Sequence, residues 1–209
     1  MADDGWPPGF FDRQDPTDDA GFYGLPRFVT HIDDHAIKAV TDLYDELAVP
    51  DGRVLDLMSS WVSHLSRRPT GGLGVLGMNA AELQANPLAG DVVLQDLNRD
   101  PSLPFEDGSF DAVTCCVSVD YLVRPVEVLR ETARVLRPGG VVVLTFSNRC
   151  FPTKAIRGWL HSDDQGHLAI VEAYLDRAGG FGEVTATRRT PARWRGDPLY
   201  AVVARRPSA

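Results

Sequence analysis

Three polar residues follow three short apolar runs in the first half of the chain, and their types suit the recognition of a nucleoside. Asp56 lies in the first run, Asn79 follows the second and Asp96 follows the third. Asn79 comes after Asp56 at about the interval of 20 residues at which nucleotide-binding α/β units place a polar side chain against the ribose hydroxyls. Leu97 could lie flat against a ring. The three runs therefore outline a nucleoside site.

The turn after Asp56 carries two serines, Ser59 and Ser60, and lacks the glycines that normally let a ligand approach such a turn. These serines are either ligand contacts or turn formers. Asn79 and the aspartates have a similar alternative, because Asn and Asp also suit the N-cap of a following helix. We expect His64, a few residues further on, to lie on a helix after this turn and to be structural.

Further candidates lie outside these runs. His31 and His35 flank two aspartates, but this spacing also arises by chance, and we expect no bound metal. One of these two histidines could serve as a general base if the N-terminal segment closes over the site, and we assign that role to His31. Tyr121 follows the fourth apolar run and is a candidate substrate contact, with a weaker candidate in Asn148-Arg149.

Aromatic residues make the first 28 positions unlike a disordered tail, so we expect an ordered arm or lid over residues 1–30. Tyr23 and Arg27 in this arm could close over a bound cofactor, with Arg27 meeting a carboxylate. By contrast, Cys115 and Cys116 lie inside an apolar run, where cysteine behaves as a small apolar residue.

The elements that must position these residues alternate between strands and helices. Helical patterns at 37–47, 80–85 and 126–136 alternate with apolar runs, which predicts an α/β fold with a mostly parallel sheet and helices on both faces. Two further helices are expected at 154–160 and 168–178. The last two strands have no helix between them and should form an antiparallel pair. The predicted strands are 54–57, 73–77, 91–95, 110–117, 141–146, 181–190 and 198–204.

Composition limits the possible function. The 209 residues suit one domain, and a formal net charge of −8 argues against a broad basic surface for nucleic acid or an anionic membrane. A small or cationic ligand fits better. Three cysteines without a disulfide framework, no signal-peptide pattern and no membrane-spanning run predict a soluble cytoplasmic protein with reduced thiols. The oligomeric state is left open.

Two stretches carry a family resemblance. The run Pro-Ser-Leu-Pro-Phe-Glu-Asp-Gly-Ser-Phe-Asp-Ala-Val at 101–113 and the turn Leu-Arg-Pro-Gly-Gly-Val at 136–141 resemble class I S-adenosylmethionine-dependent methyltransferases. The resemblance covers about residues 50–148. It implies a Rossmann-like seven-stranded sheet with an antiparallel last strand, S-adenosyl-L-methionine as cofactor, and methyl transfer to a small molecule.

The resemblance also implies roles for individual residues. Asp56 and the turn Leu57, Met58, Ser59 and Ser60 would face the methionine part of the cofactor. Asn79 would bind the ribose hydroxyls, Met78 would lie against the adenine, Asp96 would accept from the adenine amino group, the backbone N–H of Leu97 would donate nearby, and Val117 would line the other side.

The chain departs from the family pattern at the glycine motif Asp-x-Gly-x-Gly-x-Gly, where it has Met58, Ser60 and Val62. Met and Val are costly where glycine takes positive φ. The family's ribose acid is Asn79 here. Two alternatives therefore stay open: a catalytically inactive binding subunit with this fold, and an enzyme that uses the cofactor for another reaction, such as attack on its aminopropyl carbons. We expect a single domain over residues 1–209, made of the arm at 1–30, a cofactor-binding core at 50–148 and C-terminal helices and an antiparallel strand pair at 149–209.

Overall fold

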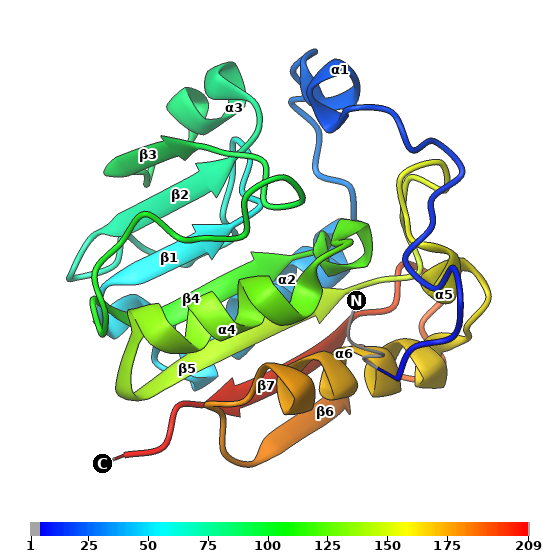
Figure 1. Cartoon of the computed structure of the whole chain (residues 1–209). Coiled ribbons are helices and arrows are strands. Elements are labelled where there is room, and N and C mark those ends of the chain that lie inside the picture. The colour runs from blue at the N-terminus through cyan, green and yellow to red at the C-terminus, as the bar shows by residue number, and fades with distance from the viewer. Residues whose placement is uncertain (1–4, 209) are drawn as a thin grey trace.

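A seven-stranded sheet forms the centre of the computed structural model, which describes residues 5–208. The strand order is β3-β2-β1-β4-β5-β7-β6, and β7 runs antiparallel to both of its neighbours, β5 and β6. This arrangement confirms the predicted sheet (Figure 1). The strands are β1 (Val54–Leu57), β2 (Leu73–Gly77), β3 (Asp91–Leu94), β4 (Phe110–Cys116), β5 (Leu136–Phe146), β6 (Val184–Arg188) and β7 (Tyr200–Arg205).

Helices cover both faces of the sheet, as predicted. One face packs against α4 and α6, and the other buries Val40 and Tyr44 of α2 (Figure 1). Helix α2 begins after Asp33, whose carboxylate accepts a hydrogen bond from the Ala36 N–H. The α-helices are α1 (Asp19–Tyr23), α2 (Asp34–Glu46), α3 (Ala80–Ala85), α4 (Pro125–Val135), α5 (Arg157–Leu160) and α6 (Asp164–Ala178), with the 3₁₀ turns η1 (Val49–Asp51) and η2 (Val119–Tyr121).

The connection from β1 to β2 contains no helix, so the prediction that His64 lies on one is wrong. Serine-rich segments favour caps and turns over helix interiors, because their hydroxyls compete for backbone hydrogen bonds. Residues outside the loop supply hydrogen bonds to its polar groups. Thr41 Oγ1 donates to the His64 carbonyl at 2.8 Å. Asn86 Nδ2 donates to the Ser60 carbonyl at 3.2 Å and to Ser63 Oγ at 2.8 Å. The loop is thus fixed without being helical.

Several element boundaries differ from the sequence prediction. Strand β5 begins at Leu136, earlier than expected, because Leu136 pairs with Phe110 before a register shift that continues with Ala112 opposite Val141. The predicted helix at 154–160 shortens to α5, since Lys154 lies in a turn. The last two strands are also shorter than predicted, and the polar loop between them is correspondingly longer.

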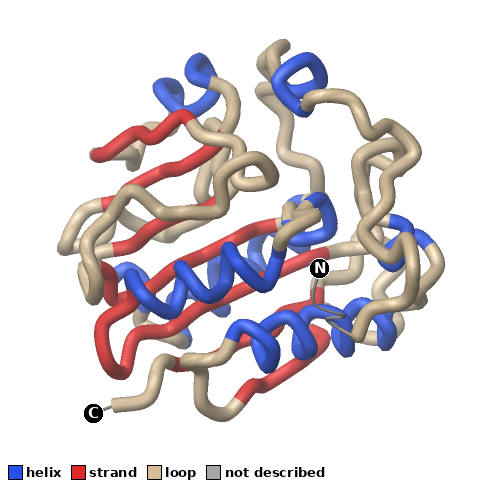
Figure 2. The backbone as a smooth tube through the Cα atoms, in the orientation of Figure 1, coloured by secondary structure: helices blue, strands red, loops and turns tan. Residues whose placement is uncertain are grey.

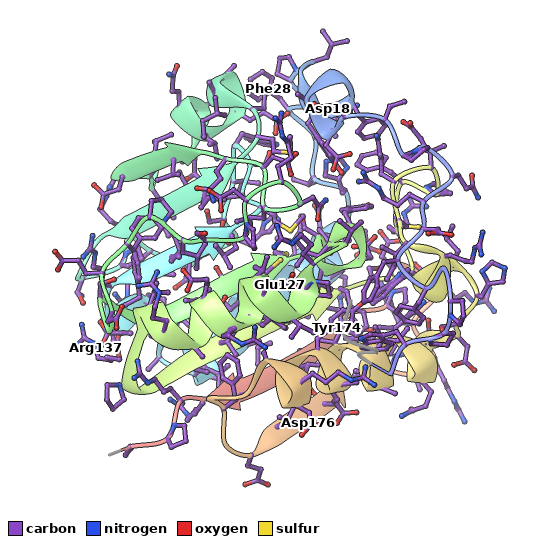
Figure 3. The ribbon with its side chains drawn as sticks, in the orientation of Figure 1. Asp18, Phe28, Glu127, Arg137, Tyr174 and Asp176 are labelled. Atoms are coloured by element: carbon purple, nitrogen blue, oxygen red, sulfur yellow. The ribbon has the colours of Figure 1, made fainter. Side chains whose placement is uncertain are left out.

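The N-terminal arm packs against the C-terminal part of the chain. Trp6 lies with its ring centroid 5.4 Å from that of Tyr174, and Phe11 also contacts this tyrosine. Tyr174 lies on α6, as Figure 3 shows. Further along the arm, Lys154 is fully buried and pairs with Asp15 at 3.0 Å and Asp19 at 3.1 Å. Residues 1–4 of the predicted arm lie outside the described residues.

The loops gather beyond the carboxyl ends of the parallel strands. Figure 2 shows them at the right of the view, where the N-terminal arm joins them. Open α/β sheets bind ligands at this edge, where the strand order reverses direction along the chain. Here that reversal lies between β1 and β4, because β2 and β3 extend the sheet on one side and β5 on the other.

Candidate active site

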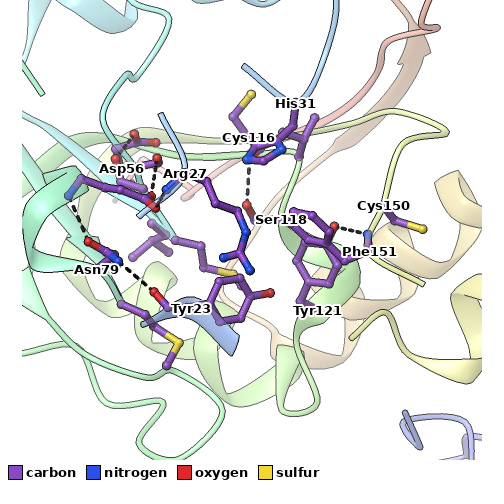
Figure 4. A pocket seen from close by; sticks show the side chains of 18 of the residues that line it. Tyr23, Arg27, His31, Asp56, Asn79, Cys116, Ser118, Tyr121, Cys150 and Phe151 are labelled. Carbon is purple, nitrogen blue, oxygen red and sulfur yellow. Dashed lines mark hydrogen bonds between the residues drawn. The ribbon is translucent and has the colours of Figure 1, made fainter. Parts of the chain in front are cut away.

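One cavity of about 580 Å³ opens at this edge of the sheet. Residues from the arm and from the ends of the parallel strands line it (Figure 4). Its volume lies within the range of about 300–1,000 Å³ that is usual for small-molecule sites. All fourteen site residues predicted from the sequence line this cavity: Tyr23, Arg27, His31, Asp56, Leu57, Met58, Ser59, Ser60, Met78, Asn79, Asp96, Leu97, Val117 and Tyr121. Their roles toward a ligand stay predictions.

Asp56 organises the turn that follows β1. Its carboxylate is almost fully buried and accepts hydrogen bonds from Ser59 Oγ at 2.6 Å and from Thr114 Oγ1 on β4 at 2.7 Å. Burial raises the pKa of the Asp56 carboxyl, and the two hydroxyl donors oppose that shift. The hydrogen bond that the Ser59 hydroxyl donates is therefore made within the protein, and it stabilises the turn.

Of the three residues that replace the family's glycines, only Met58 takes a left-handed backbone conformation. Its φ is +53°, whereas Ser60 and Val62 are not among the positive-φ residues of the described chain. The close approach expected of a glycine loop is instead permitted by Gly77 on β2, where an added Cβ would lie 2.4 Å from the Ser59 carbonyl oxygen. The Ser59 N–H donates to the Leu76 carbonyl at 2.8 Å, so the turn lies tightly against β2.

A second strained residue lines the cavity at the end of β4. Val117 has a φ of +46°, which is a rare conformation for a β-branched side chain. Its N–H donates to the Thr145 carbonyl of β5 at 2.8 Å. Backbone strain of this kind persists only where the surrounding structure determines it, and it is concentrated at ligand sites.

Asn79 caps helix α3 and also holds the arm. Its Oδ1 accepts from the N–H groups of Ala81 and Glu82 at 3.0 and 3.2 Å, while its Nδ2 donates to the carbonyls of Tyr23 and Gly24 at 2.9 and 3.2 Å. The N-cap alternative raised by the sequence is therefore present in the structure. The proposed contact of Asn79 with a ribose stays a prediction.

Glu82 was not identified from the sequence. It lies in the first turn of α3 and lines the cavity, where Oε1 accepts the Arg27 N–H at 2.6 Å and Oε2 accepts the Ser60 hydroxyl at 2.7 Å. An Asn-x-x-Glu spacing resembles the capping box that opens many helices. That pattern marks a helix start, but it does not indicate that the glutamate reaches the arm and the β1 turn.

Asp96 and Leu97 follow β3 as predicted. Asp96 Oδ1 accepts the Asn98 N–H at 2.9 Å, which forms an Asx turn, and Leu97 is nearly fully buried while still bordering the cavity. Asn98 joins three segments, since its Nδ2 donates to Asp19 of the arm and to the Tyr121 carbonyl. The end of β3 is thereby fixed to both the arm and the segment after β4.

His31 and Tyr121 meet the same residue, Phe151, from two sides. The ring centroids of His31 and Phe151 lie 5.3 Å apart, and the Phe151 N–H donates to the Tyr121 hydroxyl at 2.8 Å (Figure 4). Burial lowers the pKa of His31 below its usual value near 6.5, so its imidazole is neutral at pH 7. Burial raises the pKa of Tyr121, so its phenol keeps its proton.

Arg27 lies among aromatic rings. Its guanidinium is 4.5 Å from the Phe22 ring centroid and 5.5 Å from that of Phe151, and Nη2 donates to the Phe22 carbonyl at 2.8 Å. No ion pair of Arg27 occurs within residues 5–208. Tyr23, whose ring also faces this guanidinium, has its pKa raised by burial. The cavity thus contains the guanidinium of Arg27, whose other N–H groups can donate to a ligand.

Other cavity residues were named only weakly or not at all from the sequence. Asn148 and Arg149 line the cavity, and Arg149 pairs with Asp197 of the β6–β7 loop at 3.3 Å. Cys116 and Cys150 also border the cavity as free thiols. Across residues 5–208 no group of three or more His, Cys, Asp or Glu side chains could hold a metal ion.

Comparison with known proteins identifies what this chain is similar to. Residues 74–144 match a family described as a methyltransferase domain. A demethylmenaquinone methyltransferase of Mycobacterium sp. (strain KMS) is 34% identical over 171 residues, which cover 70% of this chain and 71% of the relative. One from Clavibacter sepedonicus is 34% identical over 106 residues, covering 48% of this chain, and here the match spans only 43% of the relative's length.

Solved structures share the fold. A putative methyltransferase from Bacillus halodurans C-125 matches 80% of this chain and 99% of its own with a TM-score of 0.57, at 15% sequence identity. An identity this low supports the fold alone. In the part of the chain that the structure describes, no helix has both the length and the apolar character needed to cross a membrane.

Proposed function

This chain belongs to the S-adenosylmethionine-dependent methyltransferases that act on small molecules, and from that premise we propose that its acceptor is a hydroxylated aromatic ring of the quinol type. One observation carries the proposal. The neutral imidazole of His31 and the ring of Phe151 border the same cavity as the strand-end residues Asp56 and Asp96. The curated relatives named above support it, since their names describe methyl transfer to a demethylmenaquinone.

The residues at the strand ends fit the cofactor. The buried Asp56 turn faces the cavity where the methionine part would lie, and Arg27 has free donors for its carboxylate, with Tyr23 beside it. Met78 and Leu97 would lie against the adenine, with Asp96 near its amino group, and Val117 would line the opposite side. When bound, S-adenosylmethionine supplies an electrophilic methyl group on a positively charged sulfur.

The chain's own contribution is to bind, position and deprotonate the acceptor. Phe151 and Tyr121 offer ring faces and edges against which a planar acceptor packs. A neutral His31 accepts the proton of the acceptor's hydroxyl, which raises the electron density of the ring. Tyr121, which keeps its proton, can donate a hydrogen bond to the resulting oxyanion. Holding acceptor and methyl donor in line supplies most of the acceleration in such transfers.

The test is a product assay with acceptors of different chemistry. The protein is incubated with S-adenosylmethionine and with unmethylated 1,4-naphthoquinol, an aliphatic amine or an aliphatic thiol, and methylated products are identified by mass spectrometry. We expect methylation of the naphthoquinol, on carbon or oxygen, and little of the other two. Efficient methylation of the amine or the thiol without turnover of the quinol would contradict the proposal.

We also propose a cytoplasmic location and a partner set limited to small molecules. The three free cysteines fit a reducing compartment. The formal net charge of −8 is unsuited to a surface that binds nucleic acid. Fractionation of cells that express the protein, followed by immunodetection, checks the location directly.

A further inference from the structure

The side chain of Asn79 has no hydrogen-bonding capacity left for a ligand. An amide nitrogen has two N–H donors, and both are used by the carbonyls of Tyr23 and Gly24. An amide oxygen has two acceptor lone pairs, and both are used by the N–H groups of Ala81 and Glu82. Asn79 occupies the position from which the family pattern would bind the ribose, but here it is committed to helix α3 and the arm.

Glu82, by contrast, retains acceptor capacity at the same end of the sheet. An ionised carboxylate has about four lone-pair sites. Within residues 5–208 it accepts two hydrogen bonds, one from the Arg27 N–H and one from the Ser60 hydroxyl. Its side chain lines the cavity between the turn after β1 and the arm, one helical turn beyond Asn79. Two acceptor sites therefore remain for two further donors.

We propose that Glu82, in place of Asn79, is the residue that binds the ribose hydroxyls of S-adenosylmethionine. The two vicinal hydroxyls of the ribose match the two acceptor sites that Glu82 has left. The change also accounts for a second departure from the family, because Ser60, at a glycine position, donates its hydroxyl to Glu82 and so fixes the carboxylate. The loss of the acid at position 79 and the loss of the glycine at position 60 are then one coupled substitution.

The proposal rests on the use of S-adenosylmethionine and is independent of the acceptor, so a binding measurement separates its failure from failure of the proposed function. Glu82→Gln keeps the size of the side chain and an oxygen for the Arg27 N–H. Calorimetry would measure the affinity of this variant for S-adenosylhomocysteine and for the analogue of S-adenosylhomocysteine that carries a 2′,3′-dideoxyribose. Glu106→Gln, the same change at an exposed acid, is the control for net charge.

We expect Glu82→Gln to weaken S-adenosylhomocysteine binding at least about tenfold, and to leave the affinity for the dideoxy analogue unchanged relative to the natural chain. Ser60→Ala should weaken the natural ligand less and keep its advantage over the analogue, because the carboxylate stays. An equal loss for both ligands in Glu82→Gln would overturn the proposal, since it would mean that Glu82 only holds the turn and the arm. Unchanged binding of both would overturn it as well. Thermal melting of each variant confirms that it is folded.

Discussion

The ammonium group of Lys154 lies 3.1 Å from the carboxylate of Asp19, and this ion pair joins the segment after β5 to the N-terminal arm with both partners almost completely buried. Asp15 also pairs with Lys154, and Arg13 pairs with Asp19 at 2.7 Å. Asp19 also lines the cavity and accepts from Asn98 Nδ2 at 3.1 Å. The cluster that anchors the arm is therefore continuous with the cavity wall.

Removal of the Lys154 charge should be strongly destabilising. Lys154→Met removes the buried cation that Asp15 and Asp19 share, while Asp19 keeps its pair with Arg13, so the cost should lie near the lower end of the about 3–5 kcal/mol that breaking one partner of a buried pair costs. Chemical denaturation measures the change in the free energy of unfolding. The chain has one other lysine, Lys38, whose pair with Asp42 is exposed. Lys38→Met should cost about 0.5 kcal/mol or less. Similar losses for both variants would show that the Lys154 cluster contributes no more than a surface pair.

The altered glycine loop gives a prediction about backbone strain. A left-handed conformation costs a non-glycine residue about 1–2 kcal/mol, and Met58 takes that conformation while Val62 does not. Met58→Gly and Met58→Ala both remove the packing of the Met58 side chain against the core, but only Met58→Gly relieves the strain, whereas at Val62, whose backbone is not left-handed, glycine only adds its entropy cost of about 0.5–1 kcal/mol relative to alanine. In urea denaturation we expect Met58→Gly to be more stable than Met58→Ala by about 1 kcal/mol, and Val62→Gly to be less stable than Val62→Ala by about 0.5–1 kcal/mol. The reverse order would contradict the strain at position 58.

The pH dependence of turnover tests His31 as the base. A base must be neutral, and burial places the pKa of His31 below 6.5, so the acidic limb of kcat/KM should fall below that pH. His31→Gln should remove this limb and lower kcat/KM by about 10²–10⁴-fold. His35→Gln is the control, because His35 stacks on Trp194 with ring centroids 4.0 Å apart and does not border the cavity. If the acidic limb of kcat/KM survives in His31→Gln, the limb reports the titration of a group other than His31.

The sequence was sufficient for the sheet and for most of the cavity because both depend on local patterns. Buried apolar runs mark parallel strands, and the residues after them, such as Asp56 and Asp96, must meet at one edge. Glu82 and Phe151 were missed because their place in the site depends on the arm, which folds back over distances that no local pattern encodes. The loop after β1 was assigned to a helix because its hydrogen-bond partners, Thr41 and Asn86, are remote in the sequence.

Asp120 behind the cavity predicts a pH dependence of stability that is independent of catalysis. It is almost fully buried, its Oδ2 has no hydrogen-bond partner in the described part of the chain, and burial raises its pKa to about 8. Between its unfolded value of 3.8 and 8, the folded chain holds one proton more than the unfolded chain at this site. Its contribution to stability is therefore complete below pH 3.8 and is lost as the pH rises toward 8, with a slope of up to about 1.4 kcal/mol per pH unit.

Asp120→Asn should remove this slope, because an amide does not titrate. Urea denaturation at intervals from pH 5 to pH 9 would show the natural chain losing stability relative to the variant until about pH 8, where the difference levels off. Cys116, whose pKa burial raises from 9.0 to about 12, affects stability only near the top of this window, and it does so equally in both proteins, so it cancels in their difference. A constant difference between the two proteins across the range would place the pKa of Asp120 outside it, and would indicate that the buried carboxyl finds a partner in solution.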